Sequence, residues 1–331
     1  MVQLFNMSSK YTISVKEISE ITGIEKSEIE KFFSMKNEDN ITEEQESKTV
    51  DYEQKVRNFF EYQAADYSFR VLAHINLRGG VGKTTCAVTL ATRAKQFGFK
   101  TCIIDIDSQA SSSLAFNVIL EEDDPVFYDV WQKPGEMVMD SIRKIEENLF
   151  ILPSSLQNGL LDLSLMNPAS QKKAVKEVCD VLKNNGFELV IIDCPPSLGT
   201  AVISTVCASN IIVIPVCSDI FSLKGIEMTS REVKSICETF SFQAPVVKIL
   251  YMKYDKREKN SIDTLLMLQE KYSEILVPTQ IGTSVLFNKC FLNRETIFAG
   301  KTKNRTRDEF DRYARNILNF FPHTFQRVEE N

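Results

Sequence analysis

The stretch Leu77-Arg78-Gly79-Gly80-Val81-Gly82-Lys83-Thr84-Thr85 decides how this chain folds. It follows an apolar run at 71–75, which predicts a β-strand, and precedes an amphipathic run at 87–94, which predicts a helix. Glycines let the backbone turn so that successive N–H groups point at one anion, and the start of the helix adds free N–H groups. The stretch therefore predicts a loop that binds nucleotide phosphates through Gly79, Gly80, Val81, Gly82, Lys83, Thr84 and Thr85.

Two side chains of this loop have distinct predicted roles. Lys83 is expected to reach the β- and γ-phosphate oxygens of a nucleoside triphosphate, and the Thr84 hydroxyl to take one position around Mg²⁺. A glycine-rich turn without a ligand is the alternative. The strand before the loop and the helix after it favour nucleotide binding.

Two further apolar runs end in carboxylates. The run at 102–106 carries Asp105 and Asp107 at its end, and the run at 189–192 ends in Asp193. Runs of Val, Ile and Leu without alternation are typical of strands covered on both faces, as in a parallel sheet. Carboxylates at the carboxyl ends of such strands face the crevice where α/β proteins bind ligands; a cap of the strand end is the alternative for either one alone.

The remaining chain also alternates between strand and helix patterns. Apolar runs at 210–215 and 246–252 predict strands, and amphipathic runs at 222–237 and 262–272 predict helices. Such alternation predicts an α/β fold, with a doubly wound and mostly parallel sheet of the P-loop NTPase type.

Composition narrows the class of protein. A chain of 331 residues can bury a full core, and no apolar run approaches the roughly 20 residues of a membrane span. The start of the chain lacks a signal-peptide pattern, so a cytoplasmic protein is expected. The eight cysteines form no C-x-x-C pair, which predicts reduced core thiols, and two histidines are too few for a histidine-based metal site.

Charge divides the chain near residue 66. Residues 1–66 carry a net charge of −6 and residues 67–331 a net charge of zero. This shift predicts an N-terminal helical extension at 1–66 and a P-loop ATPase domain at 67–331. The acidic stretch 37–53 suits a linker or the charged entry to a helix.

The extension contains a helix-turn-helix pattern. Ile18 and Ile21 form one apolar face before Gly23, and residues 29–33 form a second face after it. The second helix carries Glu25, Glu28 and Glu30, which phosphates would repel. The pattern therefore leaves two interpretations open, a DNA-reading module and a helical pair for dimerisation or partner docking.

The phosphate loop resembles the deviant Walker A motif K-G-G-x-G-K-[ST] of the ParA/MinD branch of P-loop ATPases, with Arg78 where the family has lysine. The resemblance extends over about residues 69–320, and 13–33 resembles the helix-turn-helix extension of the larger plasmid ParA proteins. It implies a nucleotide-bridged dimer in which Arg78 contacts the partner's nucleotide. Two further motifs, D-x-D-P-Q and h-h-h-h-D-x-P, imply that Asp107 positions the attacking water, that Asp193 holds Mg²⁺ through a water, and that Asp105 supports a switch region.

Later segments resemble the family less closely. Met252-Lys253-Tyr254-Asp255 lacks the asparagine of the guanine-reading N-K-x-D box and is similar to the family's T-M-Y-D-x-R stretch, which favours adenine. Gly282 stands where the family's I-P-x-x-I-R segment has arginine. The basic residues near the C-terminus are either a solvated face or a DNA contact surface, formed by Lys301, Lys303, Arg305, Arg307, Arg312 and Arg315.

By this resemblance the chain is identified as a member of the ParA family of partition ATPases. The family implies slow, Mg²⁺-dependent ATP hydrolysis with Lys83, Asp107 and Arg78 as catalytic residues. It also implies an ATP-dependent homodimer that binds nonspecific DNA on the nucleoid, release by a ParB-like centromere-binding adaptor, and regulation of its own operon. The alternatives are a MinD-like membrane-associated ATPase, a metabolic P-loop enzyme, and an operator-binding repressor with weak ATPase activity; no membrane partner is expected.

Overall fold

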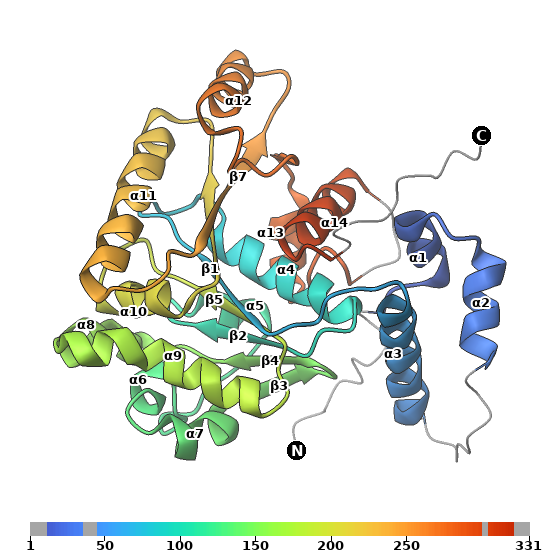
Figure 1. The fold of residues 1–331 in the computed structure, drawn as a ribbon, viewed down its shortest axis with the longest axis horizontal. Helices are drawn as coiled ribbons and strands as arrows, with labels where there is room; N and C mark the ends of the chain where they lie inside the picture. The colour runs from blue at the N-terminus through green and yellow to red at the C-terminus, as the bar shows by residue number, and fades with distance from the viewer. Residues whose placement is uncertain (1–11, 36–44, 300–303, 321–331) are drawn as a thin grey trace.

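Eight strands form one central sheet in the computed structural model, which describes residues 12–35, 45–299 and 304–320 (Figure 1). Their order is β3-β4-β2-β5-β1-β6-β7-β8, and only the β3–β4 pair is antiparallel. The predicted doubly wound, mostly parallel sheet is therefore confirmed. The strands are β1 Arg70–His74, β2 Thr101–Asp105, β3 Arg143–Glu146, β4 Leu149–Leu152, β5 Leu189–Asp193, β6 Ile211–Val216, β7 Val246–Tyr254 and β8 Ile281–Gly282.

Both faces of the sheet are covered, which explains the unbroken apolar runs. Neighbouring residues of one strand enter opposite cores: Leu72 packs on one side of β1, and Val71 and Ala73 pack on the other. The first core lies under α4 (Lys83–Gln96) and α14 (Arg305–Ile317), and the second under α9 (Pro168–Asn184), α10 (Thr200–Ala208), α11 (Ile220–Phe240) and α12 (Lys259–Tyr272). The shorter helices are α5 Ser111–Ala115, α6 Phe127–Val130, α7 Pro134–Ser141, η1 Leu156–Leu160, α8 Leu161–Ser164 and α13 Leu286–Leu292.

The register of the sheet brings the predicted site residues to one edge. In the parallel ladder Asp193 at the end of β5 lies opposite both His74 of β1 and Asp105 of β2. The loops that follow these strands therefore leave the sheet side by side. The phosphate loop, which joins β1 to α4, is one of them.

The N-terminal region forms three helices, α1 (Val15–Thr22), α2 (Lys26–Met35) and α3 (Gln45–Tyr62). The helix-turn-helix pattern is present: Gly23 ends α1 in the left-handed conformation with φ 73°, and Ile18 and Ile29 are buried. Helix α3 begins inside the acidic stretch, so its residues from 45 onward are a helix entry and not a linker; residues 37–44 lie outside the described residues.

These helices share a core with the rest of the chain. Phe60 of α3 contacts Phe97 and Phe320, with ring centroids 5.8 and 5.0 Å apart. Figure 1 shows α3 beside the far end of α4 and α1 on the side of α14. The division near residue 66 stays a prediction about domains, and in the structure it falls between α3 and β1.

Other predictions from composition concern the cysteines and the helices. All eight cysteines are free, and five of them are buried, as expected for core thiols. In the described part of the chain, no helix has the length and apolar character required to cross a membrane.

Candidate functional site: a phosphate loop at the sheet edge

The phosphate loop owes its shape to two left-handed glycines. Gly80 has φ 74° and Gly82 has φ 103°, conformations that side chains with a Cβ adopt only under strain. A Cβ on Gly82 would also lie 3.0 Å from Met252 Cε of β7. Helix α4 begins at Lys83 with no side-chain cap, so the N–H groups of its first turn are free to bind an anion.

A cavity of about 900 Å³ opens over this loop. Six of the seven predicted loop residues line it, together with Asp107 of the β2 loop. The seventh, Val81, is buried, and only its backbone faces the loop. Apolar side chains that could contact a planar base also line the cavity, among them Leu114, Val285, Phe287 and Phe291.

Lys83 lies at the base of the cavity and is held in place by a backbone oxygen. Its side chain is only 7 % exposed, and Nζ donates a hydrogen bond to the carbonyl of Arg78 at 3.1 Å. Burial lowers the pKa of Lys83, while the carboxylates of Asp193 and Asp107 oppose that shift. The cation is thus stabilised by groups that remain in place when phosphate arrives.

Asp193 and Asp105 are fully buried, and serines of α5 hold them. Ser112 Oγ donates to Asp193 Oδ2 at 2.7 Å, and Ser113 donates to Asp105 Oδ2 from both its backbone N–H and its hydroxyl, at 2.9 and 2.8 Å. Burial raises the pKa of Asp193 to about 6, although hydrogen bonds from Ser112 and Thr84 oppose the shift. Burial also raises the pKa of Asp105, and the nearby Asp193 carboxylate adds to that effect.

The donors at this point fit a magnesium ion. Asp193 Oδ1 is buried and has no hydrogen-bond partner among the described residues, and the Thr84 hydroxyl lies against the same carboxyl group. Oxygen ligands from one carboxylate and one hydroxyl are what Mg²⁺ takes when phosphates and waters complete its shell. The described residues contain no cluster of three His, Cys, Asp or Glu ligands.

Asp107 reaches the cavity from a loop that other segments fix in place. Its Oδ1 accepts a hydrogen bond from the Gln109 backbone N–H at 3.0 Å, and its carbonyl accepts one from Ser154 Oγ at 2.6 Å. Asn158 of η1 donates to the carbonyl of Asp105 at 3.2 Å. Among the described residues the second carboxylate oxygen has no hydrogen-bond partner, so it is available to orient a water.

Arg78 lies outside the nucleotide cavity in this subunit. Its guanidinium forms an ion pair with Asp219, 3.0 Å from Nη1 to Oδ1, and its side chain is 41 % exposed. Asp219 follows β6, and nothing in its local sequence indicated this role. The predicted contact of Arg78 with a partner's nucleotide stays a prediction.

Three further residues shape the site, although the sequence analysis does not predict a role for them. Ser112 and Ser113 fix the buried carboxylates, and Lys253 Nζ donates to the carbonyl of Gly80 at 2.7 Å. The serine run that starts shortly after Asp107 was a usable signal. Lys253 lies in the stretch compared with the guanine-reading box and with the family's T-M-Y-D-x-R segment, and neither comparison indicates a contact with the phosphate loop.

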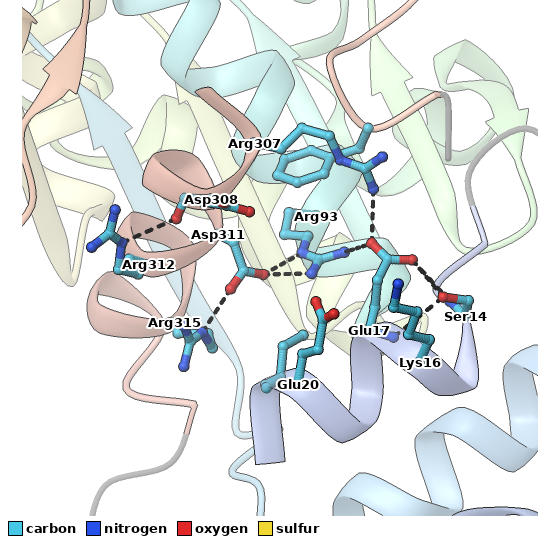
Figure 2. A pocket seen from close by; sticks show the side chains of 12 residues that line it. Ser14, Lys16, Glu17, Glu20, Arg93, Arg307, Asp308, Asp311, Arg312 and Arg315 are labelled. Carbon is cyan, nitrogen blue, oxygen red and sulfur yellow. Dashed lines mark hydrogen bonds and ion pairs between the residues drawn. The ribbon is translucent and has the colours of Figure 1, made fainter. Parts of the chain in front are cut away.

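Arg305, Arg307 and Arg315 form ion pairs with acidic side chains, and Arg312 donates to a backbone carbonyl. Lys301 and Lys303 lie outside the described residues. Arg307 is nearly buried and donates to Glu17 of α1 at 2.8 Å. Figure 2 shows Arg307, Arg312 and Arg315 around a pocket of about 650 Å³ in which acidic side chains alternate with them. The partners are Asp311 for Arg315, the Asp308 carbonyl for Arg312, and Glu309 for Arg305. DNA contact by this segment stays a prediction, and Arg307 is part of the packing between α1 and α14.

Comparison with known proteins agrees with this geometry. The family model described as AAA domain matches residues 69–246, which is more than half of the chain. The chromosome partitioning protein ParA of Caulobacter vibrioides is 24% identical over 65% of this chain and 82% of its own. The cell division protein PomZ of Myxococcus xanthus is 23% identical over 93% of each chain. The apo structure of McdA from Cyanothece has the same fold, with a TM-score of 0.68, 19% identity, and coverage of 76% of this chain and 99% of that one.

Proposed function

We propose that this chain, which belongs to the AAA domain family, is a DNA-segregation ATPase. Its relatives place it among the ParA-type partition or positioning ATPases of that family. The observation that carries the proposal is the phosphate loop with Lys83 at its base and Asp193 Oδ1 unpartnered beside Thr84. This arrangement supports ATP and Mg²⁺ as the bound species. Solved structures of the same fold are described with ATP analogues, one of them with magnesium.

We propose that the residues divide the reaction between them. The free N–H groups of the loop and the Lys83 ammonium bind the β- and γ-phosphates, and Thr84 and Asp193 hold the metal. Magnesium, when bound, neutralises charge on the phosphate oxygens. Asp107 orients a water for attack on the γ-phosphorus, and the bond to the β–γ bridging oxygen breaks to give ADP and phosphate.

We infer that ATP closes a homodimer, with Arg78 of each subunit directed at the partner's nucleotide. Asp219 holds Arg78 at the rim of the cavity, 41 % exposed, from which it can reach a facing subunit. The closed dimer binds DNA without sequence preference, and hydrolysis, stimulated by a ParB-like adaptor, releases it. The N-terminal helices are available for a second task such as regulation of its operon.

The test is binding to a labelled duplex of random sequence, by fluorescence anisotropy, without nucleotide, with ADP and with ATP, each with Mg²⁺. Binding that requires ATP, weakens steeply with salt and is absent from Lys83→Ala supports segregation. Binding to one operator that ADP favours selects a repressor. Binding to anionic vesicles in place of DNA selects a membrane-associated ATPase.

A further inference from the structure

The end of β7 contacts the phosphate loop through two consecutive residues. Met252 lies against Gly82 and Cys86, with its Sδ 3.6 Å from the Cys86 Sγ. The next residue, Lys253, donates from Nζ to the Gly80 carbonyl at 2.7 Å. Successive side chains of a regular strand point to opposite faces, so a regular strand could not present both residues to one loop.

A local distortion of the strand makes both contacts possible. Lys253 has φ 58°, a left-handed conformation that is uncommon for a residue with a Cβ. The pairing of β7 with β8 shifts register here, because Met252 pairs with Ile281 and Tyr254 with Gly282, leaving Lys253 as an extra residue. Such bulges redirect a side chain, and backbone strain of this kind is concentrated at functional sites.

The contacted carbonyl belongs to the peptide that joins Gly80 to Val81. In a trans peptide the carbonyl and the following N–H point in opposite directions. A cation that holds the Gly80 oxygen therefore also fixes the direction of the Val81 N–H, which points to the other side of the same peptide. The positive charge also polarises the peptide and strengthens that N–H as a donor.

We propose that Lys253 is a positioning residue for the nucleotide phosphates: it clamps the Gly80–Val81 peptide so that the Val81 N–H is directed into the anion cradle. Lys253 lines the nucleotide cavity, and in this proposal it acts through the Gly80–Val81 peptide on the phosphates that ADP and ATP share. Thr283 supports the clamp, since its Oγ1 donates to the Lys253 carbonyl at 3.0 Å. The inference rests on the proposed nucleotide site but not on DNA binding.

The experiment measures the affinity of fluorescent ADP and ATP analogues for the full chain and, in parallel, its thermal stability. Lys253→Met should weaken ADP and ATP binding by the same factor, about three- to tenfold, because one exposed charge-assisted hydrogen bond is lost. Lys253→Arg should restore wild-type affinity. Lys253→Gly should weaken binding to the same extent without lowering the melting temperature, since glycine accepts the positive φ. Lys256→Met, a change of an exposed lysine on the following turn, is the matched control and should bind as wild type.

Three results would overturn the inference. They are wild-type affinity in Lys253→Met, a loss confined to ATP, which would mean direct contact with the γ-phosphate, and a failure of arginine to restore binding. Lys83→Ala measured alongside separates the two proposals. If that variant keeps wild-type ATP affinity, the nucleotide site itself is wrongly assigned, whatever Lys253 does.

Discussion

The two ends of α4 present two charged cavities that differ in whether their charges are already satisfied. At its start, Lys83 faces a cavity in which Asp193 Oδ1 has no partner among the described residues. Near its end, Arg93 lies in the pocket of Figure 2 and donates to Asp311 at 2.7 Å and to Gln96 at 2.7 Å. Its charge is thus paired within the protein, whereas the phosphate loop offers N–H groups and a cation to a ligand.

The difference shows that a cluster of charges is not by itself a binding site. In the Figure 2 pocket the Glu17 carboxylate occupies the position that an anionic ligand would take. One of its oxygens accepts a hydrogen bond from Arg307, and the other accepts hydrogen bonds from the backbone N–H and hydroxyl of Ser14 at the start of α1. The pocket therefore attaches α1 to α14 and α4. Unmet hydrogen-bonding capacity, and not charge density, distinguishes the nucleotide cavity.

The largest effect should come from Arg93→Ala. The change leaves Asp311 Oδ1 without its buried partner and only Arg315 on the other carboxylate oxygen, which costs about 3 kcal/mol of folding stability. The free energy of unfolding is measured in urea, and ATP affinity of the folded fraction should not change. Arg312→Ala, at an exposed position in the same pocket, is the control and should stay within about 0.5 kcal/mol of wild type. If Arg93→Ala instead lost ATP affinity while keeping wild-type stability, the pocket of Figure 2 would take part in nucleotide binding, and the difference between the two cavities would be wrong.

Lys83→Ala should give the opposite pattern. Loss of two charge-assisted hydrogen bonds to phosphate weakens ATP binding by about a hundredfold or more. Stability should hold, because burial disfavours the charged form of this lysine, as the direction of its pKa shift shows. Calorimetric titration and urea denaturation of the same samples give both quantities. Retained micromolar ATP affinity would falsify the assignment of Lys83 to the phosphates.

Variants of Arg78 test whether an exposed arginine that is paired within its own subunit can also bind the nucleotide of the facing subunit. Arg78→Ala should weaken ATP-dependent dimerisation by about tenfold and leave ATP affinity of the monomer unchanged. Arg78→Lys keeps the charge and should dimerise as wild type. If Arg78→Ala weakens ATP binding by the monomer and leaves dimerisation unchanged, Arg78 acts within its own subunit. The proposed contact with the partner's nucleotide is then wrong.

A pH dependence at His74, a residue buried at the end of β1, concerns folding stability and not the nucleotide. Its Nε2 lies 2.9 Å from the Tyr313 hydroxyl of α14, and burial lowers its pKa to about 3. In the unfolded chain the imidazole takes a proton near pH 6.5, so between that pH and 3 the unfolded state binds more protons than the native one. Stability from this group is therefore present above pH 6.5 and falls with decreasing pH, by about 1.4 kcal/mol per unit. His74→Gln should flatten the profile between pH 7 and 5; an unchanged slope would contradict the buried neutral imidazole.

A feature of the site could be predicted from the sequence when the residues that form it lie close together in the chain. The phosphate loop, Asp107 and Asp193 could be predicted because each is a short motif next to its own strand, and a parallel sheet brings strand ends together. Asp219 and Lys253 could not, because packing between segments distant in the sequence brings them to the site. For Lys253, one bulge in β7 decides where the side chain points. Arg307 and Glu17 lie 290 positions apart in the sequence. The basic run therefore suggested a possible DNA surface, because the sequence near it does not indicate the acidic partner.

The central claim, an ATP-closed dimer opened by hydrolysis, is tested most directly with Asp107→Ala. Without the carboxylate that orients water, ATP should bind and remain intact. Sedimentation velocity should then show a stable dimer with ATP and Mg²⁺, and monomer with ADP. A variant that binds ATP with wild-type affinity and still sediments as a monomer would contradict the nucleotide-bridged dimer.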